Sequence, residues 1–262
     1  MKSAGIVASN ILIMVFMGGC VAPSSGSNTW GANAHWPSYT SLGRAAKNAI
    51  TAPDVWLPIA TAGLLLAADV DDQWSQDLAD DQPIFGSGAE KTSSSLRDIA
   101  SGAYVISALL APSPSIEAKV RGLAVGAATA AVDGLLSEGF KQWSSRQRPD
   151  DSNDNSMPSG HASKAASRIT MARENIKHIQ MSGWSRSTLN WALHGVAVGT
   201  GLARVEARRH HLSDVFVGYA LGNFVARFMH EAFLENDENG AQISFAQVED
   251  GGALTLTLPL SR

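Results

Sequence analysis

The stretch Met157-Pro158-Ser159-Gly160-His161-Ala162 opens a long polar helix pattern, and both fold and chemistry can be worked outward from it. Pro158 ends the preceding loop, Ser159 suits a helix N-cap, and Gly160 permits the close approach of another backbone. The free N–H groups of the first helical turn carry a partial positive charge. The stretch therefore predicts a helix start that binds an anion, with His161 beside it.

Two further polar blocks flank this stretch. The upstream block, residues 141–149, reads Lys-Gln-Trp-Ser-Ser-Arg-Gln-Arg-Pro, and the downstream block runs from Arg204 to Asp214. In the downstream block His210 and Asp214 are four residues apart, so on a helix they would share a face. We expect the carboxylate to accept a hydrogen bond from one ring nitrogen of His210, which leaves the other nitrogen free to attack an electrophile.

The cations of the three blocks complete the chemistry. A dianionic phosphate repels a nucleophile, and Lys141, Arg148 and Arg204 would neutralise the charge that grows on its oxygens during transfer. His161 would protonate the departing alcohol. Together the blocks predict phosphoryl transfer.

The order and spacing of these blocks resemble the phosphatidic acid phosphatase type 2 and vanadium haloperoxidase superfamily. The matching residues are Lys141, Arg148 and Pro149 in the first block, residues 158–161 in the second, and Arg204, His210 and Asp214 in the third. The resemblance implies that His210 is the nucleophile and His161 the acid. It also implies that Lys141, Arg148, Ser159, Gly160 and Arg204 bind the phosphate.

The resemblance covers roughly residues 40 to 235 and departs from the family pattern twice. Ala203 stands where the family usually has serine, which removes one hydroxyl contact to phosphate. Only the eight residues 150–157 separate the first two blocks, a shorter gap than is usual. The resemblance implies an all-α helical bundle and a metal-independent phosphatase that acts on phosphate monoesters or lipid (pyro)phosphates through a phosphohistidine.

Two other functions stay open. In a vanadium haloperoxidase the same pocket would hold vanadate and His210 would ligate it, although such enzymes are usually much longer chains. A non-catalytic envelope lipoprotein would keep the blocks only as a scaffold. The presence of an acid, a nucleophile and an orienting aspartate argues against the second alternative.

The composition limits the partners. The chain has 262 residues, of which 45% are hydrophobic, and a formal net charge of -4. This length is enough to bury a sizeable core, and the near-neutral charge argues against nucleic acid as a partner. We expect no cofactor and no metal site. The acidic run Asp150–Asn155 lacks the glycine and terminal glutamate of an EF-hand loop, so it is interpreted as a solvated loop and not as a calcium site.

The N-terminal residues 1–20 are typical of a lipoprotein signal peptide. Lys2 provides a short positive region, an apolar region follows, and two glycines precede Cys20, the single cysteine of the chain. We expect Cys20 to be lipidated and residues 21–37, rich in Ser, Gly, Asn and Pro, to form a flexible tether. The prediction is a bacterial envelope protein that is anchored to a membrane by lipid on the periplasmic side.

Apolar residues recur at three- and four-residue spacing through a catalytic domain over residues 38–238. The expected helices are Ser41–Thr51, Val55–Asp69, Ser93–Leu110, Ser115–Ser144, His161–Met181, Ser187–Val205 and Leu212–Glu235. Asp69, Asp71 and Asp72 are interpreted as a helix end. In the tail, residues 239–262, alternating apolar residues around a Gly-rich turn predict a β-hairpin.

The helices are interpreted as those of a soluble domain. Their uninterrupted apolar runs reach about 13 to 16 residues, below the roughly 18 to 20 that a bilayer core requires. The helix after His161 also carries charged residues that are costly in hydrocarbon, namely Lys164, Arg168, Arg173, Glu174 and Lys177.

Overall fold

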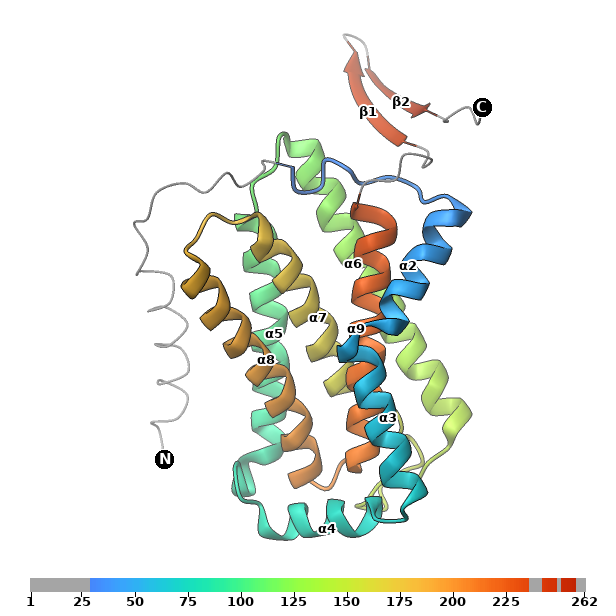
Figure 1. Cartoon of the computed structure of the whole chain (residues 1–262), viewed down its shortest axis with the longest axis vertical. Coiled ribbons are helices and arrows are strands. Elements are labelled where there is room, and N and C mark those ends of the chain that lie inside the picture. The colour runs from blue at the N-terminus through green and yellow to red at the C-terminus, as the bar shows by residue number, and fades with distance from the viewer. Residues whose placement is uncertain (1–28, 236–241, 249–250, 258–262) are drawn as a thin grey trace.

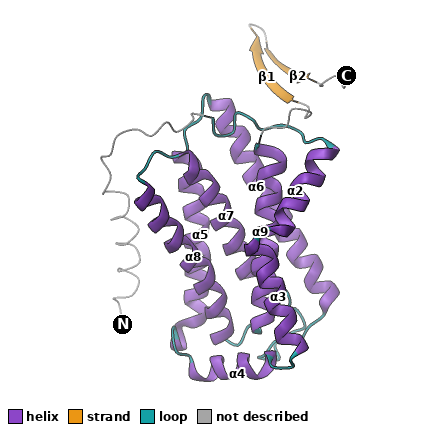
Figure 2. Cartoon of the chain, viewed as in Figure 1, coloured by secondary structure: helices purple, strands orange, loops and turns teal. Residues whose placement is uncertain are grey.

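The structure, a computed structural model, describes residues 29–235, 242–248 and 251–257. The signal peptide with Cys20, the first part of the tether and the turn of the tail lie outside the described residues. The described helices are α2 (Tyr39–Thr51), α3 (Pro53–Ala67), α4 (Asp71–Asp81), the short 3-10 helix η1 (Gly86–Gly88), α5 (Ala89–Leu110), α6 (Ile116–Ser144), α7 (Gly160–His178), α8 (Gly183–Glu206) and α9 (Leu212–Leu234). The predicted all-α fold is therefore confirmed (Figure 2).

The sequence predicts all of these α-helices except α4, with ends that differ by up to four residues. Asp71 and Asp72 do not end a helix; they form the first turn of α4. The helix is mostly polar, and the residues on its buried face are Asp71, Ser75 and Ala79. A search for apolar recurrence misses such a helix, because most of its buried face is polar.

Serine side chains fix where three of the helices begin. Ser38, Ser115 and Ser182 precede α2, α6 and α8, and each accepts a hydrogen bond from a backbone N–H of the first turn. Such an N-cap stabilises a helix by about 1 kcal/mol. These caps fix the residue at which each of the three helices begins.

Helix α7 lies in the middle of the bundle (Figure 1). It packs along α9 and α5, α8 packs against α5 and α7, and α6 contacts both α7 and α9. The core between α5, α7 and α8 includes Ala100, Ala165, Ile169 and Leu193. Helix α4 crosses the end of the bundle at which α7 begins and α8 ends.

Two glycines bring α9 against the start of α7. A Cβ atom at Gly218 would lie 2.5 Å from the carbonyl oxygen of Ser159, and one at Gly222 would lie 2.1 Å from that of Ser163. No side chain fits in that space, so glycine at both positions lets the two backbones touch. The amide of Ser159 also donates to the carbonyl oxygen of Asp214 at 2.9 Å. The anion-binding helix start predicted from the sequence is thus held on α9.

The predicted C-terminal hairpin is present. Strands β1 (Gln242–Val248) and β2 (Gly251–Thr257) pair antiparallel, with Gln242 opposite Thr257 and Val248 opposite Gly251. The hairpin lies at the end of the molecule opposite α4 (Figure 1).

Within the described residues, α6 is long and apolar enough to cross a membrane by length and composition. Its best 18-residue window has a mean hydropathy of 1.2. Helices α2 and α3 pass the same test only if they are taken together as one span, bent by 54°. The expectation that every helix is too short for a bilayer therefore does not hold for α6.

Candidate active site

The three sequence blocks meet at the end of the bundle that α4 crosses (Figure 1). Lys141 comes from the last turn of α6, residues 159–161 from the start of α7, and Arg204 from the last turn of α8. His210 follows in the loop before α9. The charges of Arg204, Arg148 and Lys141 all act on His210, which places the predicted cations around the predicted nucleophile.

His210 is buried, with 2% of its surface exposed. Its Nδ1 lies 2.7 Å from the carbonyl oxygen of Ser156, to which only a protonated Nδ1 can donate. Burial, followed by the charges of Arg204 and Arg148, lowers the pKa of His210 well below its ordinary value. The imidazole is therefore neutral, with the lone pair on Nε2 available for chemistry.

The expected hydrogen bond between His210 and Asp214 is not formed. Helix α9 begins at Leu212, so His210 lies outside it and the side-chain pairing of a helix does not apply. The nearest atoms, Nδ1 and Oδ2, are 3.9 Å apart. Asp214 instead accepts hydrogen bonds from the Ser156 hydroxyl and from the His211 amide, the latter at 2.8 Å. It reaches His210 through Ser156 and not directly.

His161 is in the first turn of α7 and contacts a residue that the sequence reasoning missed. Nη1 of Arg97, on α5, lies 3.0 Å from Nε2 of His161. Because a guanidinium can only donate, Nε2 accepts and the ring proton is on Nδ1. Burial, with Arg204 and Arg97, lowers the pKa of His161 to about 3. The sequence holds one sign of its role: Arg97 is the one cation between Lys91 and the end of α5.

Three buried donor atoms near the two histidines have no hydrogen-bond partner among the described residues. They are Nε of Arg148, Oγ of Ser159 and Nε of Arg204. A buried donor without a partner costs about 1–3 kcal/mol, so natural proteins rarely keep several together. Burial, and then the charge of Arg148, also lowers the pKa of Arg204 to about 10. An anion bound here would satisfy the donors and offset the repulsion between the cations.

Lys141 and Gly160 lie next to each other. A Cβ atom at Gly160 would be 3.2 Å from Nζ of Lys141, so the absence of a side chain leaves room for the ammonium group. That group also pairs with Glu138 at 2.7 Å.

The other candidates of the downstream and acidic segments have separate roles. His211 is the N-cap of α9, and its ring lies 3.0 Å from Asp72. In the acidic run after Pro149, Asp150 pairs with Arg209 at 2.9 Å. Asp150 is thus neutralised by an arginine.

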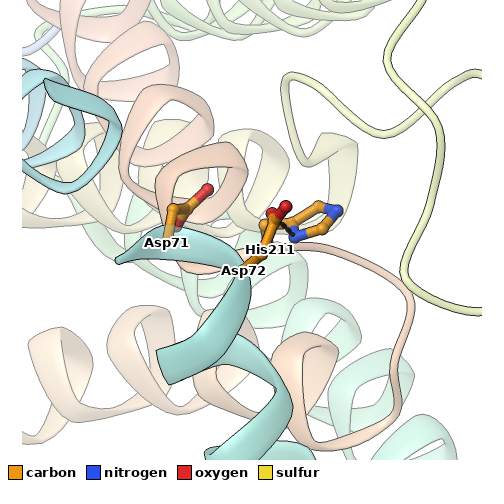
Figure 3. Close-up of side chains that lie close together, drawn as sticks. All are labelled: Asp71, Asp72 and His211. Atoms are coloured by element: carbon orange, nitrogen blue, oxygen red, sulfur yellow. Dashed lines mark ion pairs between the residues drawn. The ribbon is translucent and has the colours of Figure 1, made fainter. Parts of the chain in front are cut away.

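Among the described residues one group of carboxylates and histidine has ligand atoms close enough to hold a metal ion, namely Asp71, Asp72 and His211 (Figure 3). A cation is already present there. Nη2 of Arg146 lies 2.8 Å from Asp71 and 3.3 Å from Asp72. The group is therefore read as the carboxylate side of an ion-pair network.

A family model, the PAP2 superfamily, matches residues 122–238, which contain all three blocks. The matched residues make up less than half of the chain. The match supports a phosphatase at the level of the reaction class, as the sequence predicts. None of the curated proteins matches this chain.

One solved structure shares the fold. It is described as the crystal structure of the first transmembrane PAP2 type phosphatidylglycerolphosphate phosphatase from Bacillus subtilis. The TM-score is 0.52 at 19% sequence identity, and the match covers 66% of this chain and 90% of that chain. At this identity the likeness concerns the PAP2 fold.

Proposed function

We propose that this PAP2 protein hydrolyses phosphate esters through a phosphohistidine on His210. The observation that carries the proposal is the set of three partnerless buried donors, on Arg148, Ser159 and Arg204, next to a neutral His210. Donors fixed in advance toward an anion stabilise the charge that develops in the transition state.

The reaction has two steps. In the first, Nε2 of His210 attacks phosphorus, the bond from phosphorus to the ester oxygen breaks, and His161 gives that oxygen a proton. In the second, water attacks the phosphohistidine, its proton goes to His161, and inorganic phosphate leaves. Lys141, Arg148, Arg204 and the first turn of α7 hold the phosphoryl oxygens throughout.

To act as the acid, His161 needs a second proton, on Nε2, which it lacks in the structure because burial and the charges of Arg204 and Arg97 lower its pKa to about 3. A bound phosphate dianion would offset the charges of these arginines and raise the pKa of His161. Nε2 takes up the proton when the Arg97 guanidinium, which donates to it in the structure, turns to the phosphate, and His161 then serves as the acid.

A lipid phosphate is the proposed substrate class. An apolar groove of about 350 Å³ lies between α2, α3, α6 and α9 and is lined by Ile50, Val55, Ile59, Phe140, Val217, Ala220, Leu221 and Phe224. Phe140 precedes Lys141, and Val217 precedes Gly218, which touches Ser159. One end of the groove therefore lies close to the proposed phosphate-binding residues. Its apolar lining can hold an alkyl chain.

The proposed location is the bacterial envelope, with the domain on the periplasmic side of a membrane. Cys20, at the end of the signal peptide, would carry the lipid anchor. Large apolar side chains on the outside of the bundle add to that attachment. On α3 they include Trp56, Leu57 and Leu64, and on α6 Val120, Leu135 and Trp143.

The test uses the purified full chain, p-nitrophenyl phosphate and phosphatidate in detergent, with and without EDTA. We expect hydrolysis of both esters without added metal, inhibition by vanadate, and an acid-labile phosphoenzyme that is absent from His210→Ala. His194→Gln is the matched control, because His194 is hydrogen-bonded to Tyr219, away from the two catalytic histidines.

Three results would contradict the proposal. Loss of activity in EDTA, restored by a divalent ion, would require a metal-dependent mechanism. Vanadate-dependent oxidation of halide, without ester hydrolysis, would favour the haloperoxidase alternative, and activity in neither assay would favour the non-catalytic lipoprotein.

A further inference from the structure

Arg146 belongs to the first sequence block and bridges four side chains. Its Nη1 donates to Oδ1 of Asp214 at 2.8 Å and to Oγ of Ser213 at 2.6 Å. Its Nη2 donates to Oδ2 of Asp71 at 2.8 Å and to Oδ1 of Asp72 at 3.3 Å. The guanidinium thus joins the loop after α6 to the first turns of both α4 and α9.

The backbone of Arg146 holds the group that orients His210. Its carbonyl oxygen accepts the amide of Ser156 at 2.9 Å. The carbonyl oxygen of Ser156 in turn accepts Nδ1 of His210, and the Ser156 hydroxyl donates to Asp214. Arg146 is therefore hydrogen-bonded to both Ser156 and Asp214. Ser156 in turn accepts the hydrogen bond that sets the tautomer and direction of His210.

Helix α4 closes the network from the other side. Asp71 is buried and accepts from the amide of Ser213 at 2.9 Å and from its hydroxyl at 2.5 Å. The amide of Leu212 donates to Ser75 at 2.8 Å. Two N–H groups that the start of α9 would otherwise leave free are thus capped by α4. Because Arg146 neutralises Asp71, this buried carboxylate is satisfied by a side chain of the protein.

We propose that Arg146 and Asp71 are positioning residues that fix Asp214 and Ser156, and so aim Nε2 of His210 at the phosphorus atom. This inference rests on the proposed function. Neither residue contacts the substrate. Their effect is on the geometry of attack, to which rates are sensitive: a displacement of 1 Å can reduce a rate about 100-fold.

The experiment compares Arg146→Gln, Arg146→Lys and Asp71→Asn with the wild-type chain. The readouts are kcat and KM for p-nitrophenyl phosphate, the rate of phosphoenzyme formation, and the Kd for inorganic phosphate. We expect Arg146→Gln to lower kcat about 10- to 100-fold while KM and Kd change less than threefold. Arg146→Lys should restore part of kcat, because one cation can still reach Asp214. The double variant Arg146→Gln/Asp71→Asn should lose less than the product of the two single losses, because the residues act as one unit.

Arg208→Gln is the matched control. Arg208 also pairs with an aspartate of α4, Asp80, but both side chains are exposed and neither touches Asp214 or Ser156. It should keep the wild-type kcat. If Arg146→Gln does not fold, the smaller changes Asp71→Asn and Arg146→Lys decide the question by the same readouts.

The outcomes separate this inference from the function on which it rests. If His210→Ala is inactive while folded Arg146→Gln keeps kcat within twofold, the positioning role is wrong and the proposed function stands. A higher KM with unchanged kcat would instead make Arg146 a substrate contact, which also overturns the inference. If His210→Ala is as active as the wild type, the proposed function fails first.

Discussion

At the scale of single residues, the two histidines that are proposed to be catalytic differ in their hydrogen-bond partners. His210 donates to a backbone carbonyl, and His161 accepts from Arg97. Replacing His210 by Ala should reduce kcat below about 1% and abolish the trapped phosphoenzyme, because the variant lacks the proposed nucleophile. The measurement is turnover together with trapping of the labelled phosphoenzyme by an alkaline quench. Retention of more than a few per cent of activity would show that another residue is the nucleophile.

Replacing His161 by Ala should act differently. For phosphatidate, whose alcohol is a poor leaving group, kcat should fall about 100- to 10,000-fold because general acid catalysis is lost. For p-nitrophenyl phosphate, whose leaving group needs little protonation, the loss should be much smaller and the phosphoenzyme should still form. The measurement compares the loss of kcat for phosphatidate with the loss for p-nitrophenyl phosphate. Equal losses for both would assign His161 to phosphate binding.

The pH dependence follows from the lowered pKa values. With an ordinary pKa of 6.5, the neutral fraction of His210 would fall about 25-fold between pH 7 and pH 5. The pKa of His210 lies well below that value, through burial and the charges of Arg204 and Arg148, so the nucleophile stays neutral over this range. We expect kcat/KM for p-nitrophenyl phosphate to show no such 25-fold loss at pH 5. A decline centred near pH 6.5 would show that His210 is not buried as described.

The residue types at the site could be predicted because they lie in short contiguous blocks. The roles of Arg97, and of Arg146 inside the first block, could not be predicted, because they come from contacts with His161 and Asp214 that are distant in the chain. The direct bond from His210 to Asp214 is the wrong prediction at this scale. The pairing requires His210 to lie on the helix, but the helix begins at Leu212, the start that the sequence itself predicts.

At the scale of elements, the packing of α9 on α7 depends on the absence of a side chain at Gly222. Replacing Gly222 by Ala should lower the free energy of unfolding by roughly 1–3 kcal/mol, because the new Cβ atom would overlap the carbonyl oxygen of Ser163. Gly195→Ala on α8 is the control, since nothing lies within 4 Å of its added Cβ atom, and it should stabilise by up to about 1 kcal/mol. Denaturant unfolding measures both. A similar effect of the two substitutions would show that the helices do not touch at Gly222.

The burial of α7 also changes how its charges are interpreted. The charges after His161 suggest a soluble domain when the sequence is considered alone. In the structure, α7 lies in the middle of the bundle and packs against α5, α8 and α9. Its composition says little about the surface. That surface is formed by the outer helices, where α3 carries no charge between Asp54 and Asp69.

At the scale of the whole molecule, attachment to the membrane would combine the lipid on Cys20 with the apolar outside of α3, α5, α6 and α8. Cys20→Ser should therefore lose acyl labelling yet stay in the membrane fraction after a high-salt wash, and detergent should release it. The measurement separates the membrane and soluble fractions and assays the activity of each. An active Cys20→Ser protein in the soluble fraction would support the sequence-based hypothesis of a soluble domain on a lipid anchor.

The choice between a lipid phosphate and a small ester depends on the groove between α3, α6 and α9. Val217→Trp would fill part of this groove, one residue before Gly218 on α9. If the groove holds the alkyl chain, the ratio of kcat/KM for a long-chain phosphatidate to that for a short-chain one should fall about tenfold, since about 1.4 kcal/mol of chain burial is lost. Val198→Trp, on the exposed outside of α8, is the control and should leave the ratio unchanged. An unchanged ratio in Val217→Trp, with wild-type unfolding behaviour, would mean that the chain binds elsewhere and that a small phosphate ester is the better candidate.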